Sequence, residues 1–309
     1  MSRNIYFAAC LLIITIIAGC VSQTKILIAS YSAPREHKKV EMMISSGDNT
    51  DTGKYLTLSI DPDVGGVNSL SSNTGIATML IDDIKERLTE TNFISIHPIF
   101  DPEDNGLKIS VASYQYLQTS NNIKANLRVN FILSRGVTEF FSKSYDASEV
   151  RFSKSGQGLP SKELIEGLMT KKCTTLFIRD ISPTKILQLR EFKSFPSKIA
   201  YVAEFAKVKN YEAGIKAMNE YNGNKDVAFH YNLAILYEAL ASDREDIKYL
   251  TEANQHYDLA MAGGGGNDKL IVKSKARFDN YYRLFSKIEN QTFQNLGRQK
   301  ELQEEYGTE

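Results

Sequence analysis

The most regular pattern in the chain is an alternation of apolar and polar side chains between residues 123 and 133. The apolar positions are odd-numbered and the polar positions even-numbered: Ile123, Ala125, Leu127, Val129, Phe131 and Leu133 alternate with Lys124, Asn126, Arg128 and Asn130. A period of two residues predicts a β-strand with one face buried and one face in water. Shorter β-rich or apolar runs predict further strands at 25–31, 56–60, 93–96, 107–111, 140–145 and 186–189.

Two segments between these strands carry the helical period instead. In the first, apolar residues recur every four positions from Ile76 to Leu88, which predicts a helix with one apolar face. In the second, Ser161 can cap a helix that extends to residue 181. The side chains expected to face inward from that helix are Leu164, Leu168 and Leu176. These strands, together with the two helices between them, predict a mixed α+β domain over residues 24–192.

From residue 195 onward the apolar period is helical throughout. Helices are predicted at about 197–208, 211–222, 226–241, 246–262 and 269–294. The run Gly263–Gly266 is expected to be a flexible break. It does not match a phosphate-binding loop, because a helix precedes it and no Lys-Ser/Thr pair follows in register. An all-α domain over 195–294 and a polar tail over 295–309 complete the predicted organisation.

The first 19 residues have a different character. Arg3 gives a positive start and residues 5–18 are almost wholly apolar, which is the pattern of a secretory signal. The apolar run is shorter than the ~20 residues that a transmembrane helix needs, so a membrane-spanning anchor is the disfavoured alternative. The segment Ile17-Ala18-Gly19-Cys20 resembles the lipobox of bacterial lipoproteins. That resemblance implies cleavage before Cys20, attachment of diacylglycerol to its thiol, and a lipidated tether at 20–23.

The residue after the lipid-bearing cysteine bears on sorting. In enteric lipoproteins an aspartate at this position retains the protein at the inner membrane, whereas Val21 stands there in this chain. The resemblance therefore implies a cell-envelope protein at the outer membrane, facing the periplasm. The inner membrane and display on the cell surface stay open as alternatives.

Charge and cysteine usage narrow the function classes. The chain has 37 basic and 37 acidic residues, so no global field favours nucleic acid as a partner. Of its three cysteines, Cys10 leaves with the signal and Cys20 takes the lipid. Cys173 is then alone in the mature chain, and we expect it to be a buried structural thiol rather than half of a disulfide.

Catalytic and metal-binding motifs are missing from the sequence. It contains no Gly-x-Ser-x-Gly, His-Glu-x-x-His or Cys-x-x-Cys motif, and Asp82 and Asp83 are adjacent, so they face different sides of a helix. We therefore expect no enzyme, no cofactor, no metal and no small-molecule substrate.

Two helices of the second half resemble a tetratricopeptide repeat. Its first helix presents Leu233, Ala234 and Tyr237, and its second presents Ala253, Tyr257 and Ala260. Small residues at these offsets let antiparallel helices approach, and the aromatic ring fills the notch beside them. The loop near 242–245 is expected to carry an insertion, and a further helix pair would use Ala276, Tyr281 and Leu284. A generic helical bundle stays open as the alternative.

The repeat resemblance implies a concave groove that binds a protein partner. Within that groove, Tyr231 and Asn232 are the candidate partner-binding side chains. The first hypothesis is accordingly a membrane-anchored, non-catalytic adaptor.

The whole arrangement resembles a group of uncharacterised bacterial lipoproteins with a small α/β domain before a tetratricopeptide region. The matching residues are 17–20, Ile181-Ser182-Pro183 and 231–237. The first domain also resembles, faintly, the curli-secretion lipoproteins and periplasmic activators of peptidoglycan synthases. This resemblance implies the second hypothesis, a regulator of cell-wall synthesis or a component of a surface-export complex. A secretion barrel needs two long hairpins, and only residues 123–145 could supply one here.

Overall fold

The computed structural model describes residues 24–40, 57–62, 65–66, 73–91, 93–97, 100, 105–153 and 158–306. The predicted signal, the lipobox and the tether at 20–23 lie outside these ranges. A sheet-rich N-terminal region and a helical C-terminal region make the chain mixed α and β, which confirms the predicted fold class at that level. Within the described residues, no helix combines the length and the apolarity required to cross a bilayer.

The chain divides into two compact units whose limits differ from the predicted 24–192 and 195–294. The helical unit comprises Ile186–Tyr282 with the described residues up to Ser30, and the sheet unit comprises Tyr31–Lys185 and Arg283–Glu309. The division falls inside strands β1 (Lys25–Ser32) and β8 (Thr184–Glu191), which pair as a two-stranded sheet, and inside helix α9 (Lys269–Tyr306). The predicted polar tail is thus helical as far as Tyr306.

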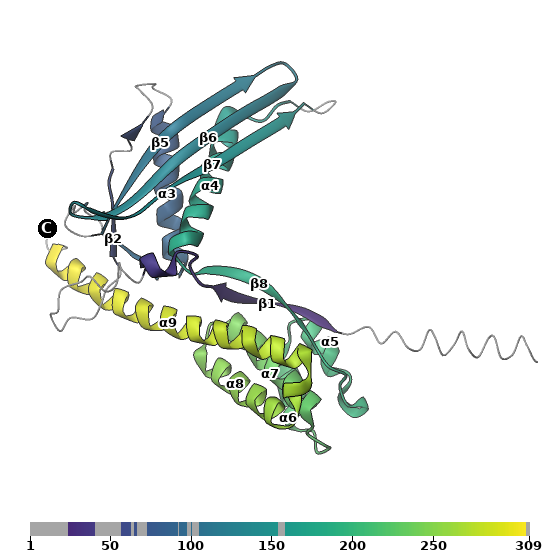
Figure 1. Cartoon of the computed structure of the whole chain (residues 1–309). Helices are drawn as coiled ribbons and strands as arrows, with labels where there is room; N and C mark the ends of the chain where they lie inside the picture. Colours follow the sequence, from purple (N-terminus) through teal and green to yellow (C-terminus); the bar gives the residue numbers. More distant parts are fainter. Residues whose placement is uncertain are drawn as a thin grey trace, which may run out of the picture. The chain divides into compact units, whose positions relative to one another are not determined.

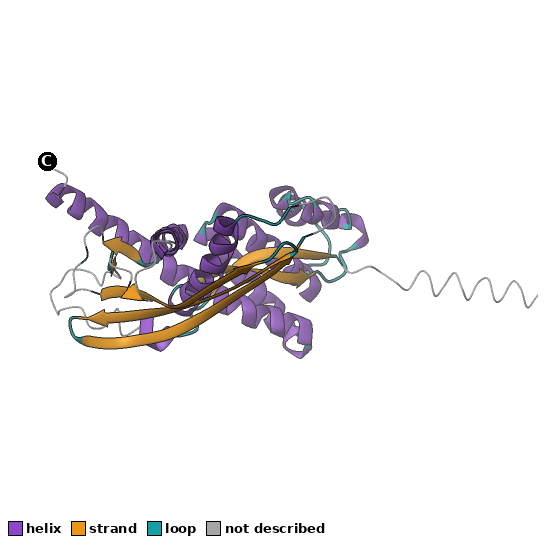
Figure 2. Ribbon diagram, turned by 90° about the horizontal axis from the view of Figure 1, so that it is seen from above, coloured by secondary structure: helices purple, strands orange, loops and turns teal. Residues whose placement is uncertain are grey.

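The sheet unit is built on a six-stranded sheet in the order β4-β2-β5-β6-β7, with β3 paired to β5 outside this path. Its strands are β2 (Thr57–Ile60), β3 (Gly65–Gly66), β4 (Ser95–His97), β5 (Asn105–Gln118), β6 (Asn122–Arg135) and β7 (Thr138–Phe152). β2 is parallel to β4 and β5, whereas β5, β6 and β7 form an antiparallel meander of long, twisted strands (Figure 2). Helices α3 (Asn73–Thr91) and α4 (Lys162–Ile181) lie together along one face of the sheet (Figure 1).

The predicted alternation along β6 is confirmed. Every apolar residue of the run is buried under the helices, where Phe131 stacks on Phe177 of α4 with ring centres 4.4 Å apart. The opposite face is polar. There Arg128 pairs with Asp146 of β7 at 2.6 Å, and the Ser144 hydroxyl donates to Asn130 at 2.6 Å.

Strand β5 is longer than the predicted 107–111 because a β-bulge interrupts its alternation. The register with β6 shifts between Val111 and Ser113. Up to Val111 the odd-numbered residues face the core, and after the bulge Tyr114 and Tyr116 do so instead. A change of phase of this kind ends a period-two pattern although the strand continues.

The buried face of α4 is one residue later than predicted. Ile165, Met169, Cys173, Phe177 and Ile181 recur every four residues and are buried, whereas Leu164 is 56 % exposed. Leu168 and Leu176 are half-buried beside this stripe. The error arose because leucines flank the true stripe, so an equally regular apolar spacing was available one position earlier.

The interior position of Cys173 confirms the expected buried thiol. Its side chain is fully buried, and burial raises the pKa of the thiol to about 12. The group therefore stays protonated near neutral pH and is a poor nucleophile.

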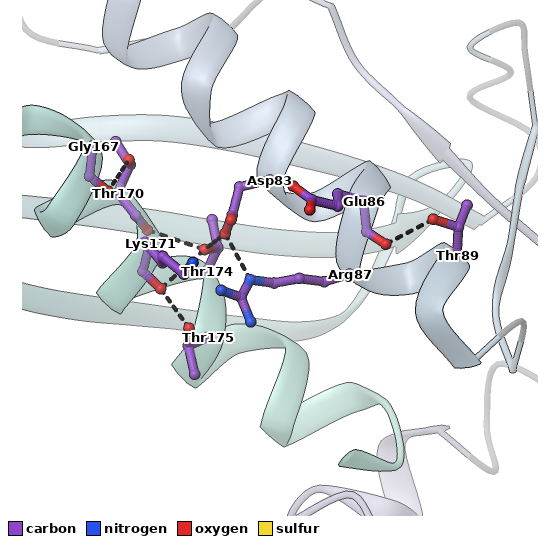
Figure 3. A network of polar contacts seen from close by, with 9 residues as sticks. All are labelled: Asp83, Glu86, Arg87, Thr89, Gly167, Thr170, Lys171, Thr174 and Thr175. Carbon is purple, nitrogen blue, oxygen red and sulfur yellow. Dashed lines mark hydrogen bonds and ion pairs between the residues drawn. The ribbon is translucent and has the colours of Figure 1, made fainter. Parts of the chain in front are cut away.

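A polar network joins α3 to α4 (Figure 3). The Asp83 carboxylate accepts from Arg87 Nε at 2.8 Å and from the buried hydroxyl of Thr174 on the other helix. Thr175 and Thr170 donate to backbone carbonyls of their own helix. The carboxylate is satisfied from both helices, so the contact fixes how the two helices face each other.

The last part of α9 belongs to the sheet unit. Leu284 and Ile288 are part of the unit's hydrophobic core, and the ring of Phe285 lies 6.1 Å from that of Tyr31. The Thr292 hydroxyl donates to the carbonyl of Thr91, the last residue of α3, at 3.3 Å. Residues 283–293 therefore pack on the sheet unit although they continue a helix that begins in the helical unit.

The helical unit contains α5 (Val202–Lys207), α6 (Tyr211–Asn219), α7 (Val227–Arg244), α8 (Ile247–Ala262) and the first part of α9. Asn210, Asp226 and Asp246 cap α6, α7 and α8 by accepting from backbone N–H groups of the first turn. The turn between α7 and α8 is only Glu245 and Asp246, with Glu245 in the left-handed region at φ 51°. The residues expected as a loop insertion extend α7 instead.

The run Gly263–Gly266 between α8 and α9 includes positions that require glycine, so it is more than a flexible break. Gly264 has φ 113°, where a side chain would be strained. At Gly265 an added Cβ would lie 2.5 Å from the carbonyl oxygen of Ala260. These glycines let the chain turn closely against the end of α8.

We predict that Phe177→Ala destabilises the protein by about 3–5 kcal/mol, because it removes a fully buried ring that stacks on Phe131. Leu164→Ala on the same helix is the matched control and should change the free energy of unfolding by about 0.5 kcal/mol or less. Urea unfolding measures both. A larger loss for Leu164→Ala than for Phe177→Ala would contradict the observed burial of α4.

Candidate functional site

A buried ion pair lies at the centre of the helical unit. Arg190 of β8 binds Glu238 of α7 through Nη2–Oε1 at 2.6 Å and Nε–Oε2 at 3.1 Å, and both side chains are fully buried. The Tyr257 hydroxyl of α8 donates to Glu238 Oε2 at 2.9 Å. Burial lowers the pKa of Arg190, but the Glu238 carboxylate outweighs that effect and raises it overall, so the guanidinium stays charged.

Tyr231 and Asn232, the predicted partner-binding side chains, lie inside the unit and face no groove. Both are fully buried. Asn232 Oδ1 accepts from the backbone N–H of Lys193 at 2.8 Å, and its Nδ2 donates to the Lys193 carbonyl at 3.0 Å. The Tyr231 hydroxyl donates to the Glu191 carbonyl at 2.9 Å. These residues hold the segment after β8, and this correction removes them from any partner surface.

The residues of the repeat signature meet where α7 and α8 pack. Leu233, Ala234, Ala253, Tyr257 and Ala260 are buried. Their small side chains let the two helices approach, and Tyr257 fills the space between them and α9, with its ring 4.8 Å from that of Phe278. They act as packing residues and have no free group to offer a ligand.

The helix pair expected from Ala276, Tyr281 and Leu284 does not form as predicted. Ala276 is exposed, and the buried positions of α9 in this unit include Ser274, Phe278 and Tyr281. No second helix follows α9 within the described residues.

Tyr237 belongs to a different surface, on the side of α7 that stays accessible. From Phe229 to Ala241 every residue of α7 is buried except His230 and Tyr237, which are half-buried and seven residues apart. The ring of His256, from α8, lies 5.6 Å from the Tyr237 ring at 11° and 5.4 Å from the His230 ring at 21°. We call these three side chains the imidazole–tyrosine surface.

Helix α6 borders the same surface. Asn219 Nδ2 donates to the Tyr237 hydroxyl at 3.4 Å. About two helical turns after Tyr237, Arg244 pairs with Glu212 of α6 at 2.9 Å. Contacts from α6 and α8 therefore hold the aromatic rings in place. Beyond them, the charges of Arg244 and Glu212 neutralise each other.

The two histidines share one proton. Their Nδ1 atoms are 3.2 Å apart, and the two rings are stacked with their planes inclined by 21°. One Nδ1 donates and the other accepts, an arrangement that is lost when both rings are protonated. Among the described residues no cluster of three or more His, Cys, Asp or Glu side chains could hold a metal ion.

The surroundings keep the pair neutral. Burial lowers the pKa of His256 to about 4, helped by the nearby charges of His230 and Lys225. Burial and Lys225 also lower the pKa of His230, against the opposing effect of Asp226. The surface is consequently uncharged and aromatic at neutral pH.

The sequence carries a partial signal for the buried ion pair. Glu238 is a lone carboxylate inside a run of apolar residues on α7, and such a group requires a buried partner. The partner itself, Arg190, is 48 residues away and could not be identified from spacing.

Comparison with known proteins leaves the chain without a family. Its sequence matches no protein-family model and no curated protein. Similar solved structures include a hypothetical protein from Chlamydia trachomatis, with 12% identity, a TM-score of 0.30, and coverage of 40% of this chain and 94% of that one. A minor lipoprotein from Acinetobacter baumannii has 15% identity and a TM-score of 0.29, covering 43% of this chain and 96% of that one. PelC from Paraburkholderia phytofirmans, described as a dodecamer, has 10% identity and a TM-score of 0.26, covering 49% of this chain and 96% of that one. TM-scores of this size carry no argument about function.

We predict a pH-dependent loss of stability centred on His256. As the pH falls from about 6.5, the ordinary histidine value, towards about 4, the unfolded chain takes up a proton that the folded chain resists. Stability is thus fully present above the unfolded pKa and is lost as the pH falls through the folded one. His256→Phe keeps a ring against Tyr237 and removes the titration.

Urea unfolding between pH 7.5 and pH 4 checks this. The free energy of unfolding of His256→Phe should improve relative to wild type as the pH falls, whereas Tyr237→Phe should follow the wild-type profile. A constant difference between His256→Phe and wild type across this range would contradict the prediction, because it would show that folding leaves the pKa of the imidazole unchanged.

Proposed function

We propose that the protein is a lipid-anchored bacterial lipoprotein that acts as a non-catalytic adaptor and binds a protein partner through tetratricopeptide-like helices. The lipobox residues 17–20 support the anchor, which would place acyl chains on Cys20. Val21 supports sorting to the outer membrane, with the folded units in the periplasm.

The helical unit supports the repeat assignment by its succession of packed neighbours. α5 packs on α6, α6 on α7, and α7 on α8. A stack in which each helix contacts the next presents one accessible side over several helices. The signature residues of α7 and α8 occupy the packing positions that such a repeat requires.

The observation that carries the adaptor proposal is the imidazole–tyrosine surface. In a helix otherwise buried from Phe229 to Ala241, only His230 and Tyr237 stay accessible, and His256 extends the surface from α8. Tyrosine and neutral imidazole rings offer contact area together with hydrogen-bonding groups, which suits an extended peptide better than a highly charged one.

A second candidate, contact with cell-wall or export machinery through the sheet unit, is favoured by one corner of the sheet. Leu117, Val150 and Phe152 are exposed on the face away from the helices, at 66%, 49% and 69%. Lys124 of β6 pairs with Leu117 of β5 on one side and with Val150 of β7 on the other. Two residues earlier on β6, Asn122 pairs with Phe152 of β7. The apolar corner is a contact surface separate from the helical unit.

Photo-crosslinking in living cells separates the candidates. A photoreactive amino acid at Tyr237 should capture a protein partner, whereas the same probe at the exposed Val208 should not. Tyr237→Ser in a chain probed at His230 should reduce capture by about tenfold or more, as expected for loss of an aromatic anchor. Capture at Phe152 and none at Tyr237 would contradict the adaptor and favour the second candidate.

The anchor has its own test. Labelled palmitate fed to cells should mark the wild-type chain and leave Cys20→Ala unlabelled. Equal labelling of the two chains, or no labelling of either, would contradict lipidation at Cys20.

A further inference from the structure

The ribbon formed by β1 and β8 presents an apolar face to solvent. Phe192 N donates to the carbonyl of Thr24 at 2.9 Å, and Lys25 pairs with Glu191 at 3.2 Å, so the start of β1 meets the end of β8. The strands are thus antiparallel (Figure 1). This register, continued along the ribbon, brings Leu27 opposite Leu189 and Ala29 opposite Leu187.

The two faces of this ribbon differ sharply in burial. Ile26, Ile28 and Arg190 point inward and are buried. On the other face Leu27 is 55%, Leu187 69% and Leu189 49% exposed. We call these three side chains the leucine face. Exposed leucines gathered on one side of a two-stranded ribbon are typical of a contact surface rather than of chance exposure.

The position of the ribbon along the chain limits what can cover the leucine face. Five peptide units separate Cys20 from Lys25, so an extended chain spans at most about 18 Å between them. Leu27 is two residues further on. If Cys20 carries the acyl chains, β1 is the first described strand after the anchor, and the membrane surface is always within reach of it.

The chemistry of the ribbon end also suits a lipid surface. Lys25 and Glu191 neutralise each other, so no unpaired charge at this end opposes approach to the headgroups. Leucine side chains gain free energy on entering the boundary between headgroups and acyl chains. The diacylglycerol on Cys20 would supply the stable attachment, and the apolar contact would add a fixed orientation to it.

We propose that the leucine face of the β1–β8 ribbon, made by Leu27, Leu187 and Leu189, is a bilayer-contacting surface that lies in the lipid interface when Cys20 is acylated. This inference rests on the proposed lipid anchor. It extends that anchor from a flexible attachment to a defined orientation of the ribbon on the membrane.

The full-length lipidated protein, reconstituted into vesicles of phosphatidylethanolamine and phosphatidylglycerol, tests the proposal. An environment-sensitive dye is attached at Leu187→Cys, and the matched control is Val208→Cys, an exposed apolar position of the same unit. The native Cys173 is fully buried with a raised pKa, so it should not react with the dye. The dye at position 187 should be quenched by brominated lipids, and the dye at position 208 should not.

Further arms separate this proposal from the anchor itself. One arm uses a chain made without its signal and with Cys20→Ser, whose binding to vesicles should be weak. Leu27→Ser/Leu189→Ser in this chain should lower the vesicle affinity about tenfold or more, because each leucine contributes roughly fivefold to membrane affinity. Leucine-dependent vesicle binding by this chain would support the bilayer surface even if palmitate labelling disproved the anchor. Absence of quenching at position 187 in a chain that carries palmitate would overturn the proposal. If the dye at position 187 reports the same apolar environment without vesicles, the proposal is also overturned. A second copy or another protein surface would then cover the leucine face.

Discussion

The helical unit depends on the buried pairing of Arg190 with Glu238. Two full charges are removed from water, and only their two-point contact, completed by the Tyr257 hydroxyl, offsets that desolvation. The pair joins strand β8 to helices α7 and α8. Since β8 pairs with β1, the same contact fixes the ribbon that follows the predicted lipid tether. An accessible surface on α7 is therefore connected to strand β1 by packed structure within one unit.

The neighbouring contacts extend this connection. Asn232 and Tyr231 bind the backbone at Lys193 and Glu191, shortly after Arg190. Side chains of α7 thus hold three of the four positions from 190 to 193. The residues expected to contact a partner instead maintain the unit, and the surface proposed for a partner is the imidazole–tyrosine surface on the accessible side of the same helix. Its two histidines add a pH-sensitive contact between α7 and α8, because their Nδ1–Nδ1 hydrogen bond is lost when both rings are protonated.

Local patterns predicted those parts of the fold in which local chemistry decides the outcome. The alternation along β6 fixed its buried face, and the period from Ile76 to Leu88 fixed that of α3. Predictions failed where a second apolar spacing of equal regularity existed, or where the alternation along a strand changed phase. Leu164 offered a false stripe one residue before Ile165, and the bulge after Val111 hid the second half of β5. The unit limits were missed because β1, β8 and α9 each cross them, which no composition change marks.

For the candidate site, the sequence identified the correct helices and mostly the wrong side chains. The small and aromatic offsets located the α7–α8 hairpin, but burial of Tyr231 and Asn232 depends on a segment some 40 residues earlier in the chain. His230 and His256 are 26 residues apart and meet only because the turn at Glu245 is short. Pairings of this range follow from the tertiary packing, to which spacing along a single chain gives no access.

A double-mutant cycle on Arg190 and Glu238 tests the central claim most directly. Urea unfolding would compare Arg190→Met, Glu238→Leu and the double variant with wild type, with Lys25 and Glu191 as an exposed control pair. Each single change should cost about 3–5 kcal/mol because it leaves one buried charge without its partner, and the double variant should lose much less than the sum. The control pair should show a coupling of about 1 kcal/mol or less. Additive losses at Arg190 and Glu238 would contradict the account, because the ribbon and the hairpin would then not be held together by this contact.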